Sequence, residues 1–123
     1  MGDSLSFDEA IRVGVEASES DAVRVNQVSE IFRDAAASVS SYLGKRAEFC
    51  LRGERRNELG LEVDGGWHKV CEFEQLTDVA FPVRLRYASV NRHARDADEL
   101  REAFVKMLSS PHFGWILLWI KGR

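Results

Sequence analysis

The chain lacks the sequence motifs typical of common enzymes and cofactor-binding proteins. Gly65-Gly66 is not followed by the Lys-Ser/Thr pair that a phosphate-binding loop needs. A Gly-x-Ser-x-Gly nucleophile motif and a His-Glu-x-x-His metal-binding helix are also missing. We therefore expect a protein that is not an enzyme, with no catalytic residues, no cofactor and no metal site.

Long hydrophobic runs and a secretion signal are absent as well. The longest apolar run has eight residues, well below the ~20 that a helix needs to cross a bilayer. The first ten residues, MGDSLSFDEA, contain neither the basic region nor the apolar region of a signal peptide. These absences predict a cytoplasmic protein that does not associate with membranes.

Cysteine and histidine are scarce, with two and three copies respectively. Two cysteines in a cytoplasmic protein are more often free thiols than a disulfide, and they are too few for a four-cysteine zinc site. Cys50 and His68 both occupy positions on the polar face of two predicted strands, so they could meet as a thiol–imidazole pair. An inert thiol and a surface histidine are the more common outcome, which is the interpretation we adopt.

The composition is that of one globular domain covering residues 1–123. Hydrophobic residues make up 45% of the chain and charged residues 30%, which excludes a disordered or fibrous protein. Charge is unevenly divided, because residues 1–44 carry eight acids against three arginines, whereas the remainder carries twelve acids against fourteen bases. Such a division can steer an oppositely charged partner, although it also arises by chance.

The N-terminal third predicts two helices, over residues 6–17 and 18–43. Ser6 and Glu9 form a capping box at the start of the first helix. Apolar residues with a period of 3.6 run through the second helix, which ends at Gly44. A second capping box predicts a third helix over residues 96–108.

Between the helices, apolar residues alternate with charged ones, a pattern typical of strands with one face in the core. Short connections such as Asp64-Gly65-Gly66 favour an antiparallel meander in chain order. Pro82 lacks a backbone donor and suits an edge strand or a bulge. The alternation predicts four strands, over residues 47–52, 58–63, 67–74 and 79–87.

The run Phe113–Ile120, FGWILLWI, is apolar at every position, and we interpret it as a fifth strand. The predicted fold class is therefore α+β in two layers: two N-terminal helices, a four-stranded antiparallel meander, a third helix and a C-terminal edge strand.

An edge strand that is apolar on both faces is an aggregation hazard unless something covers it. We therefore expect a homodimer or a contact with a protein partner at this strand. Two alternatives remain open: the first helix wraps around to cover it, or the meander splits and admits it centrally. The expected self-association residues are Trp115, Ile116, Leu118 and Trp119.

Four arginines, Arg84, Arg86, Arg92 and Arg95, follow one another with no acid between them. Arginine is enriched in protein interfaces, so we assign these residues to partner binding. Binding of an anion or a nucleic acid is the alternative. Nucleic acid is the less favoured partner, because the chain is acidic, with a pI of about 5.6.

The leading functional hypothesis is a non-enzymatic protein that occludes or escorts a protein partner. In size, acidity and order of elements the chain resembles small bacterial or phage inhibitory proteins, such as immunity proteins, anti-defence proteins and secretion chaperones. No residue motif contributes to this resemblance, and the partner's identity does not follow from it. The alternative is a small-ligand-binding domain or enzyme, with a pocket between sheet and helices lined by Trp67, Phe73 and Tyr87.

Overall fold

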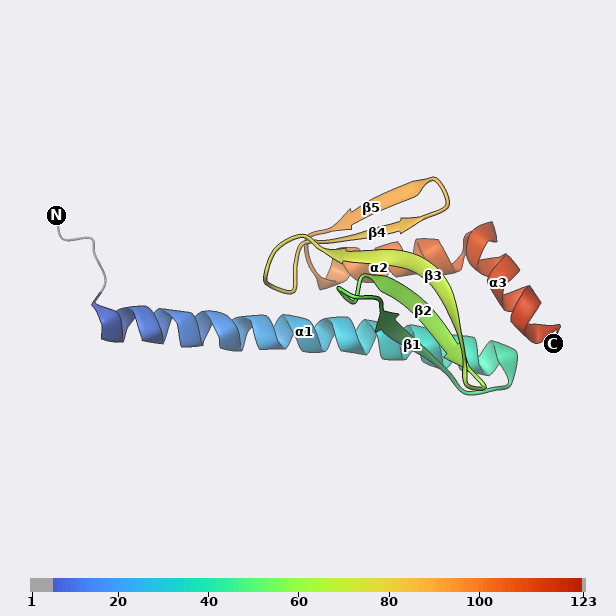
Figure 1. Ribbon diagram of the computed structural model, residues 1–123, viewed down its shortest axis with the longest axis horizontal. Coiled ribbons are helices and arrows are strands. Elements are labelled where there is room, and N and C mark those ends of the chain that lie inside the picture. Colours follow the sequence, from blue (N-terminus) through green and yellow to red (C-terminus); the bar gives the residue numbers. More distant parts are fainter. Residues whose placement is uncertain (1–5, 123) are drawn as a thin grey trace.

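A computed structural model describes residues 6–122, which form helices and one antiparallel sheet (Figure 1). The five strands pair in chain order, each with the next. The elements are α1 (Phe7–Leu43), β1 (Ala47–Arg52), β2 (Glu58–Val63), β3 (Gly66–Gln75), β4 (Val83–Tyr87), β5 (Val90–Ala94), α2 (Ala97–Leu108) and α3 (Pro111–Lys121).

The helices and the sheet form two layers, which confirms the predicted α+β class. The C-terminal half of α1 packs against β1 and α2, whereas its N-terminal half projects beyond the rest of the protein (Figure 1). α3 lies at the opposite end of the molecule, beside α2 and β3. The outer face of the sheet carries charged side chains that reach solvent.

The prediction of two N-terminal helices was wrong, because α1 is a single helix of 37 residues. Its ends are as predicted: the Ser6 side chain accepts a hydrogen bond from the Glu9 N–H, and Gly44 closes the helix with a φ of 67°. The second start signal, residues 18–21, lies inside the helix. Serine and aspartate can occupy a helix interior when their side chains point away from the helix backbone, as that of Asp21 does in accepting from the Ala80 N–H, and no proline interrupts the chain here.

The four-stranded meander was also an incomplete prediction. β5 was missed because its sequence, VNRHA, is largely polar and its turn, Ala88-Ser89, lacks the usual Asn-Gly or Asp-Gly pair. β4 is therefore an interior strand and not an edge. Pro82 lies just before its first residue, where its carbonyl oxygen accepts from the Leu76 N–H at 3.1 Å and no donor is required of it.

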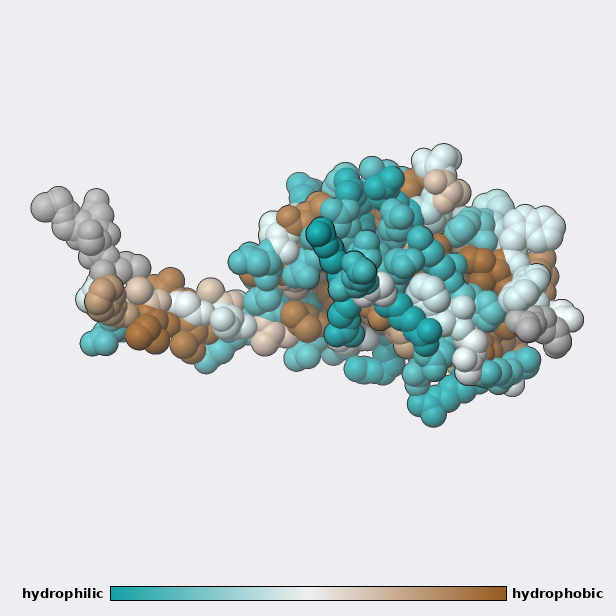
Figure 2. Space-filling view, viewed as in Figure 1, coloured by the Kyte–Doolittle hydropathy of each residue, from teal (hydrophilic) through white to brown (hydrophobic). Residues whose placement is uncertain are grey.

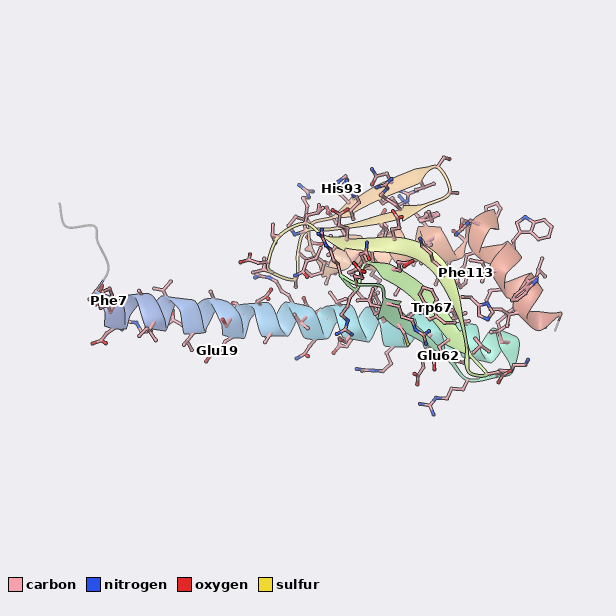
Figure 3. All side chains as sticks on the ribbon, viewed as in Figure 1. Phe7, Glu19, Glu62, Trp67, His93 and Phe113 are labelled. Atoms are coloured by element: carbon pink, nitrogen blue, oxygen red, sulfur yellow. The ribbon has the colours of Figure 1, made fainter. Side chains whose placement is uncertain are left out.

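A β-bulge in β3 reverses the expected orientation of its first residues. Leu59 pairs with Cys71 and Gly60 with Lys69, so Val70 is an extra residue. If the bulge is ignored, counting alternate residues back from Cys71 places Trp67 on the core-facing side of the sheet, which is the wrong side. Trp67 pairs with Glu62, whose carboxylate is on the outer face (Figure 3).

Five phenylalanine rings join the layers. Phe104 of α2 lies 5.4 Å from Phe32 of α1 and 5.6 Å from Phe49 of β1, measured between ring centroids. Phe32 also meets Phe73 of β3 edge-on at 5.5 Å, and Phe49 stacks on Phe113 of α3 at 6.3 Å. Every helix therefore contacts the sheet, or another helix on it, through an aromatic ring.

The predicted C-terminal edge strand was wrong, because the apolar run forms α3. The Ser110 side chain accepts a hydrogen bond from the Phe113 N–H, and Pro111 occupies the first helical turn. Proline is favoured there because the missing N–H would have no helical partner anyway. Phe113 and Ile120 are buried, seven residues apart on one face of the helix.

Gly60 is required by the indole of Trp67, which lies across it on the outer face. A Cβ atom at Gly60 would be 2.1 Å from Trp67 Cε2, closer than real contacts allow. Trp67 Nε1 also donates to the Cys50 carbonyl oxygen at 3.4 Å. We expect Gly60→Ala to lower the free energy of unfolding by about 1–3 kcal/mol through overpacking, measured by urea denaturation.

Gly14 provides the matched control for this prediction. It lies in exposed helix, and a Cβ there meets no atom within 4 Å. In dilute, monomeric protein, Gly14→Ala should therefore leave stability unchanged or raise it by up to about 1 kcal/mol, from helix propensity alone. Equal stability of Gly60→Ala and the unchanged protein would contradict the role assigned to Gly60.

Candidate protein-binding surfaces

The outward side of α3 exposes three large apolar residues, which we call the α3 patch. Trp115, Leu118 and Trp119 are 72%, 56% and 57% exposed, and their spacing of three and four residues places them on one side of the helix. The Trp119 ring lies edge-on to His68, with 5.3 Å between centroids. The patch therefore reaches from α3 toward the first residues of β3.

α3 is attached to the protein at both ends. In its first turn, His112 Nε2 lies 2.7 Å from the carbonyl oxygen of Val70, the bulge residue of β3. A carbonyl oxygen only accepts, so Nε2 must carry the hydrogen. In its last turn, the Lys121 ammonium lies 4.2 Å from the centre of the Tyr42 ring. The α3 patch is thus presented on an anchored element.

Three of the four predicted self-association residues, Trp115, Leu118 and Trp119, form the α3 patch together. The fourth, Ile116, is half-buried and packs toward the core. A strand would have separated alternate residues onto opposite faces, whereas the helix gathers residues three and four apart. That self-association occurs here stays a prediction.

A second exposed apolar surface was not anticipated from the sequence. We call residues 7–28 of α1 the arm; every residue from 7 to 20 is exposed, and Phe7 is 89% exposed. Hydrophobic residues gather along this projecting part of the helix (Figure 2). Their helical spacing is visible in the sequence, but the same spacing is expected of a helix that faces the core of its own molecule.

A groove lies where the arm leaves the body of the protein, and we call it the root groove. Its volume is about 510 Å³. Asp21 fixes one side of it, because its carboxylate accepts a hydrogen bond of 2.8 Å from the Ala80 N–H in the loop before β4. The lining residues are Ala17, Ser18, Asp21, Ala22, Val25, Asn26, Asp78 and Val79.

The four predicted partner-binding arginines do not form one free cationic surface. Arg84 and Arg86 lie on the outer face of the sheet and pair with Glu74 and Glu72 respectively. These carboxylates offset the positive charge that an anion or nucleic acid would require.

The other two arginines line an open hollow between β5 and α2, of about 470 Å³. Arg92 Nε donates to the Tyr87 hydroxyl at 3.4 Å. The Arg95 guanidinium and backbone N–H both donate to Glu99, and these hydrogen bonds lower the pKa of that carboxyl to about 2. Arg95 is therefore already committed to a carboxylate.

The thiol–imidazole pair does not form. Cys50 lies beside Glu62 on the outer face, with 3.9 Å between Sγ and Oε2, while the His68 ring packs against Trp119 of α3. Burial raises the pKa of the Cys71 thiol to about 12, and the Cys50 pKa is raised by burial and by the nearby carboxylate of Glu62. Neither thiol is a ready nucleophile at neutral pH.

The proposed small-ligand pocket is not assembled from the expected residues. Phe73 and Tyr87 are buried in the core, whereas Trp67 lies on the outer face. Within residues 6–122, no group of three His, Cys, Asp or Glu side chains is placed to hold a metal ion. The same part of the chain contains no helix with the length and apolar character to cross a bilayer.

Thiol reactivity tests the environment of the two cysteines. At pH 8 we expect the native protein to react slowly at Cys50 and not at Cys71 with an aromatic disulfide reagent, because both pKa values are raised. Full denaturation should release two reactive thiols. Cys50→Ser should abolish the native reaction and Cys71→Ala should leave it unchanged. Two fast thiols in the native protein would contradict this account.

Comparison with protein-family models, with curated proteins and with solved structures finds no match for this chain. The surfaces themselves must therefore supply the argument for function.

Proposed function

We propose that this chain is a non-enzymatic protein-binding protein that occludes or escorts a protein partner. The observation that supports the proposal is the α3 patch, in which Trp115, Leu118 and Trp119 are exposed together. Single exposed apolar residues are common on protein surfaces, but a contiguous group is typical of an interaction site. Tryptophan is also among the residues that contribute most to binding energy.

The anchoring of α3 strengthens this proposal. A binding surface that is already ordered loses less conformational entropy when a partner docks. His112 and Phe113 hold the first turn of α3, and Ile120 and Lys121 hold the last. The two tryptophans therefore project from a backbone that does not need to reorganise.

Steric action on a partner fits the chemistry of the described residues. The pKa values of both thiols are raised, and the candidate pair of Cys50 and His68 is separated. The carboxylates on the sheet pair with arginines and lysines. The finer proposal is a small inhibitory, immunity or chaperone-type protein of bacterial or phage origin. In that role the α3 patch covers, or is covered by, an apolar surface of the partner.

Affinity capture with a matched pair of variants tests the proposal. Leu118→Lys places a charge in the α3 patch, whereas Val105→Lys places one at another exposed apolar position, on α2. We expect the unchanged protein and Val105→Lys to capture the same partner from a lysate of the native host. Leu118→Lys should bind it at least about 30-fold more weakly, the effect of losing a binding contact of about 2 kcal/mol.

Titration of the captured partner against each purified variant gives the affinities. Circular dichroism should show equal helix content in both variants, since both residues are exposed. Equal affinity of Leu118→Lys and the unchanged protein would remove α3 as the binding surface.

A further inference from the structure

We propose that the arms of two copies pair antiparallel, so that Phe7 of each copy enters the root groove of the other. This contact uses a different surface from the α3 patch and does not depend on the proposed function. The molecule that packs on the arm is thus a second copy of the chain.

The arm needs a cover that its own molecule does not provide. Helices of fewer than ~12–15 residues are marginal in water, and most helical stability in proteins comes from packing of an apolar face. Residues 7–20 are all exposed, and they include Val13, Gly14 and Val15, which have low helix propensity. Packing against a second helix would supply the missing stabilisation.

The arm continues the apolar face by which α1 enters the core. With 100° of rotation per residue, Phe7, Ile11 and Val25 lie on the same side of the helix as Phe32 and Val39. The acidic side chains of the arm lie mostly on the other side, namely Asp8, Glu9, Glu16 and Glu19. A helix docking on the arm would therefore meet an extension of the core face on which Asp21, held by the Ala80 N–H, is the one acidic residue.

The order of large and small residues along this face favours a crossing of two identical helices. Its middle is small, with Gly14, Ala17 and Ser18, and its ends are large, with Phe7 and Val25. Two helices approach each other most closely where they cross, and the side chains at that point set the distance. Small residues suit the crossing point, and large residues fill the widening space on either side.

Antiparallel pairing with Gly14 opposite Ser18 brings Phe7 of one copy opposite Val25 of the other. Val25 lines the root groove, whose volume of about 510 Å³ and apolar residues suit an aromatic ring. Among residues 6–122, Phe7 is the most exposed of the large apolar side chains. Burying such a ring removes roughly 150–250 Å² from water.

Charge does not decide the direction of the pairing. The tip of the arm carries the positive end of the helix dipole but also Asp8 and Glu9 in its first turn, and the root groove carries the carboxylates of Asp21 and Asp78. The fit of Phe7 to the root groove is what favours the antiparallel direction.

The bodies of the two copies lie apart in this arrangement. A rise of ~1.5 Å per residue places the two Val28 positions roughly 36 Å apart, at opposite ends of the paired arms. Only about half of each arm can face its partner, fewer than the ~20–30 residues per side of a standard interface. We therefore expect a dissociation constant on the order of micromolar.

Sedimentation equilibrium of the full chain tests the dimer with a matched pair of variants. Val25 faces the root groove, and Val23, two residues away, lies on the opposite side of the arm, with exposures of 48% and 59%. We expect a concentration-dependent dimer for the unchanged chain and for Val23→Asp. Val25→Asp should weaken the dimer by at least about tenfold. A monomer at all concentrations, or equal dimerisation of the two variants, would overturn the proposal.

Cross-linking tests the direction and register, in a Cys50→Ser background that leaves only the buried Cys71. Ala10 lies opposite Ala22 of the second copy in the proposed register, whereas the two copies of Ala10 lie roughly 18 Å apart along the arms. A short thiol cross-linker should join Ala10→Cys protein to Ala22→Cys protein when they are mixed. Neither variant should cross-link to itself.

Three further outcomes separate this proposal from its alternatives. Self-cross-linking of Ala10→Cys would indicate parallel arms. A dimer abolished by Leu118→Lys and unaffected by Val25→Asp would place self-association at the α3 patch. Loss of partner capture by Leu118→Lys, with dimerisation intact, leaves the arm proposal standing and shows that the two surfaces act separately.

Discussion

The contact of Phe104 with Phe32 and Phe49 decides how the remaining elements are arranged. It joins α1, α2 and the first strand at one point, and Phe49 passes the packing on to Phe113 of α3. Aromatic rings bury large areas and prefer the edge-on and offset geometries observed here. Each helix must therefore turn one face toward this cluster. The face that remains outward is then set by helical geometry, which is why both candidate surfaces follow from the core.

The cluster is small relative to the apolar surface of the helices that it holds. α1 packs on the core from about Val28 onward, so its first five turns have no sheet beneath them (Figure 1). α3 turns Phe113 and Ile120 inward, so Trp115 and Trp119 are left outside. Both helices thus have more apolar surface than one core can cover. In α3 the apolar residues extend around more of the circumference, and in α1 they extend over more of the length.

Local signals identified most of the elements from the sequence, and they failed where two structures share one pattern. The caps at Ser6 and Gly44 and the alternation in β1 and β2 depend on neighbouring residues alone, and they were predicted correctly. An eight-residue apolar run is compatible with a strand or a buried helix. The deciding signal, Ser110-Pro111, directly follows the helix predicted over residues 96–108, where it suits a helix end as well as a helix start.

The orientation of Trp67 depends on a bulge at Val70, and bulges have no fixed sequence pattern. The alternation of inward and outward side chains could therefore not be followed across it. The α3 residues of the candidate site were nevertheless identified, because a continuous apolar run demands cover in either structure. The arm was missed because its amphipathic pattern is the same whether the facing surface belongs to the same molecule or to another.

In the proposed dimer the two α3 patches point away from each other, at opposite ends of the paired arms. A partner with two matching sites could gain avidity only if those sites are separated by that span. The length of α1 would then determine which assemblies the protein can bridge.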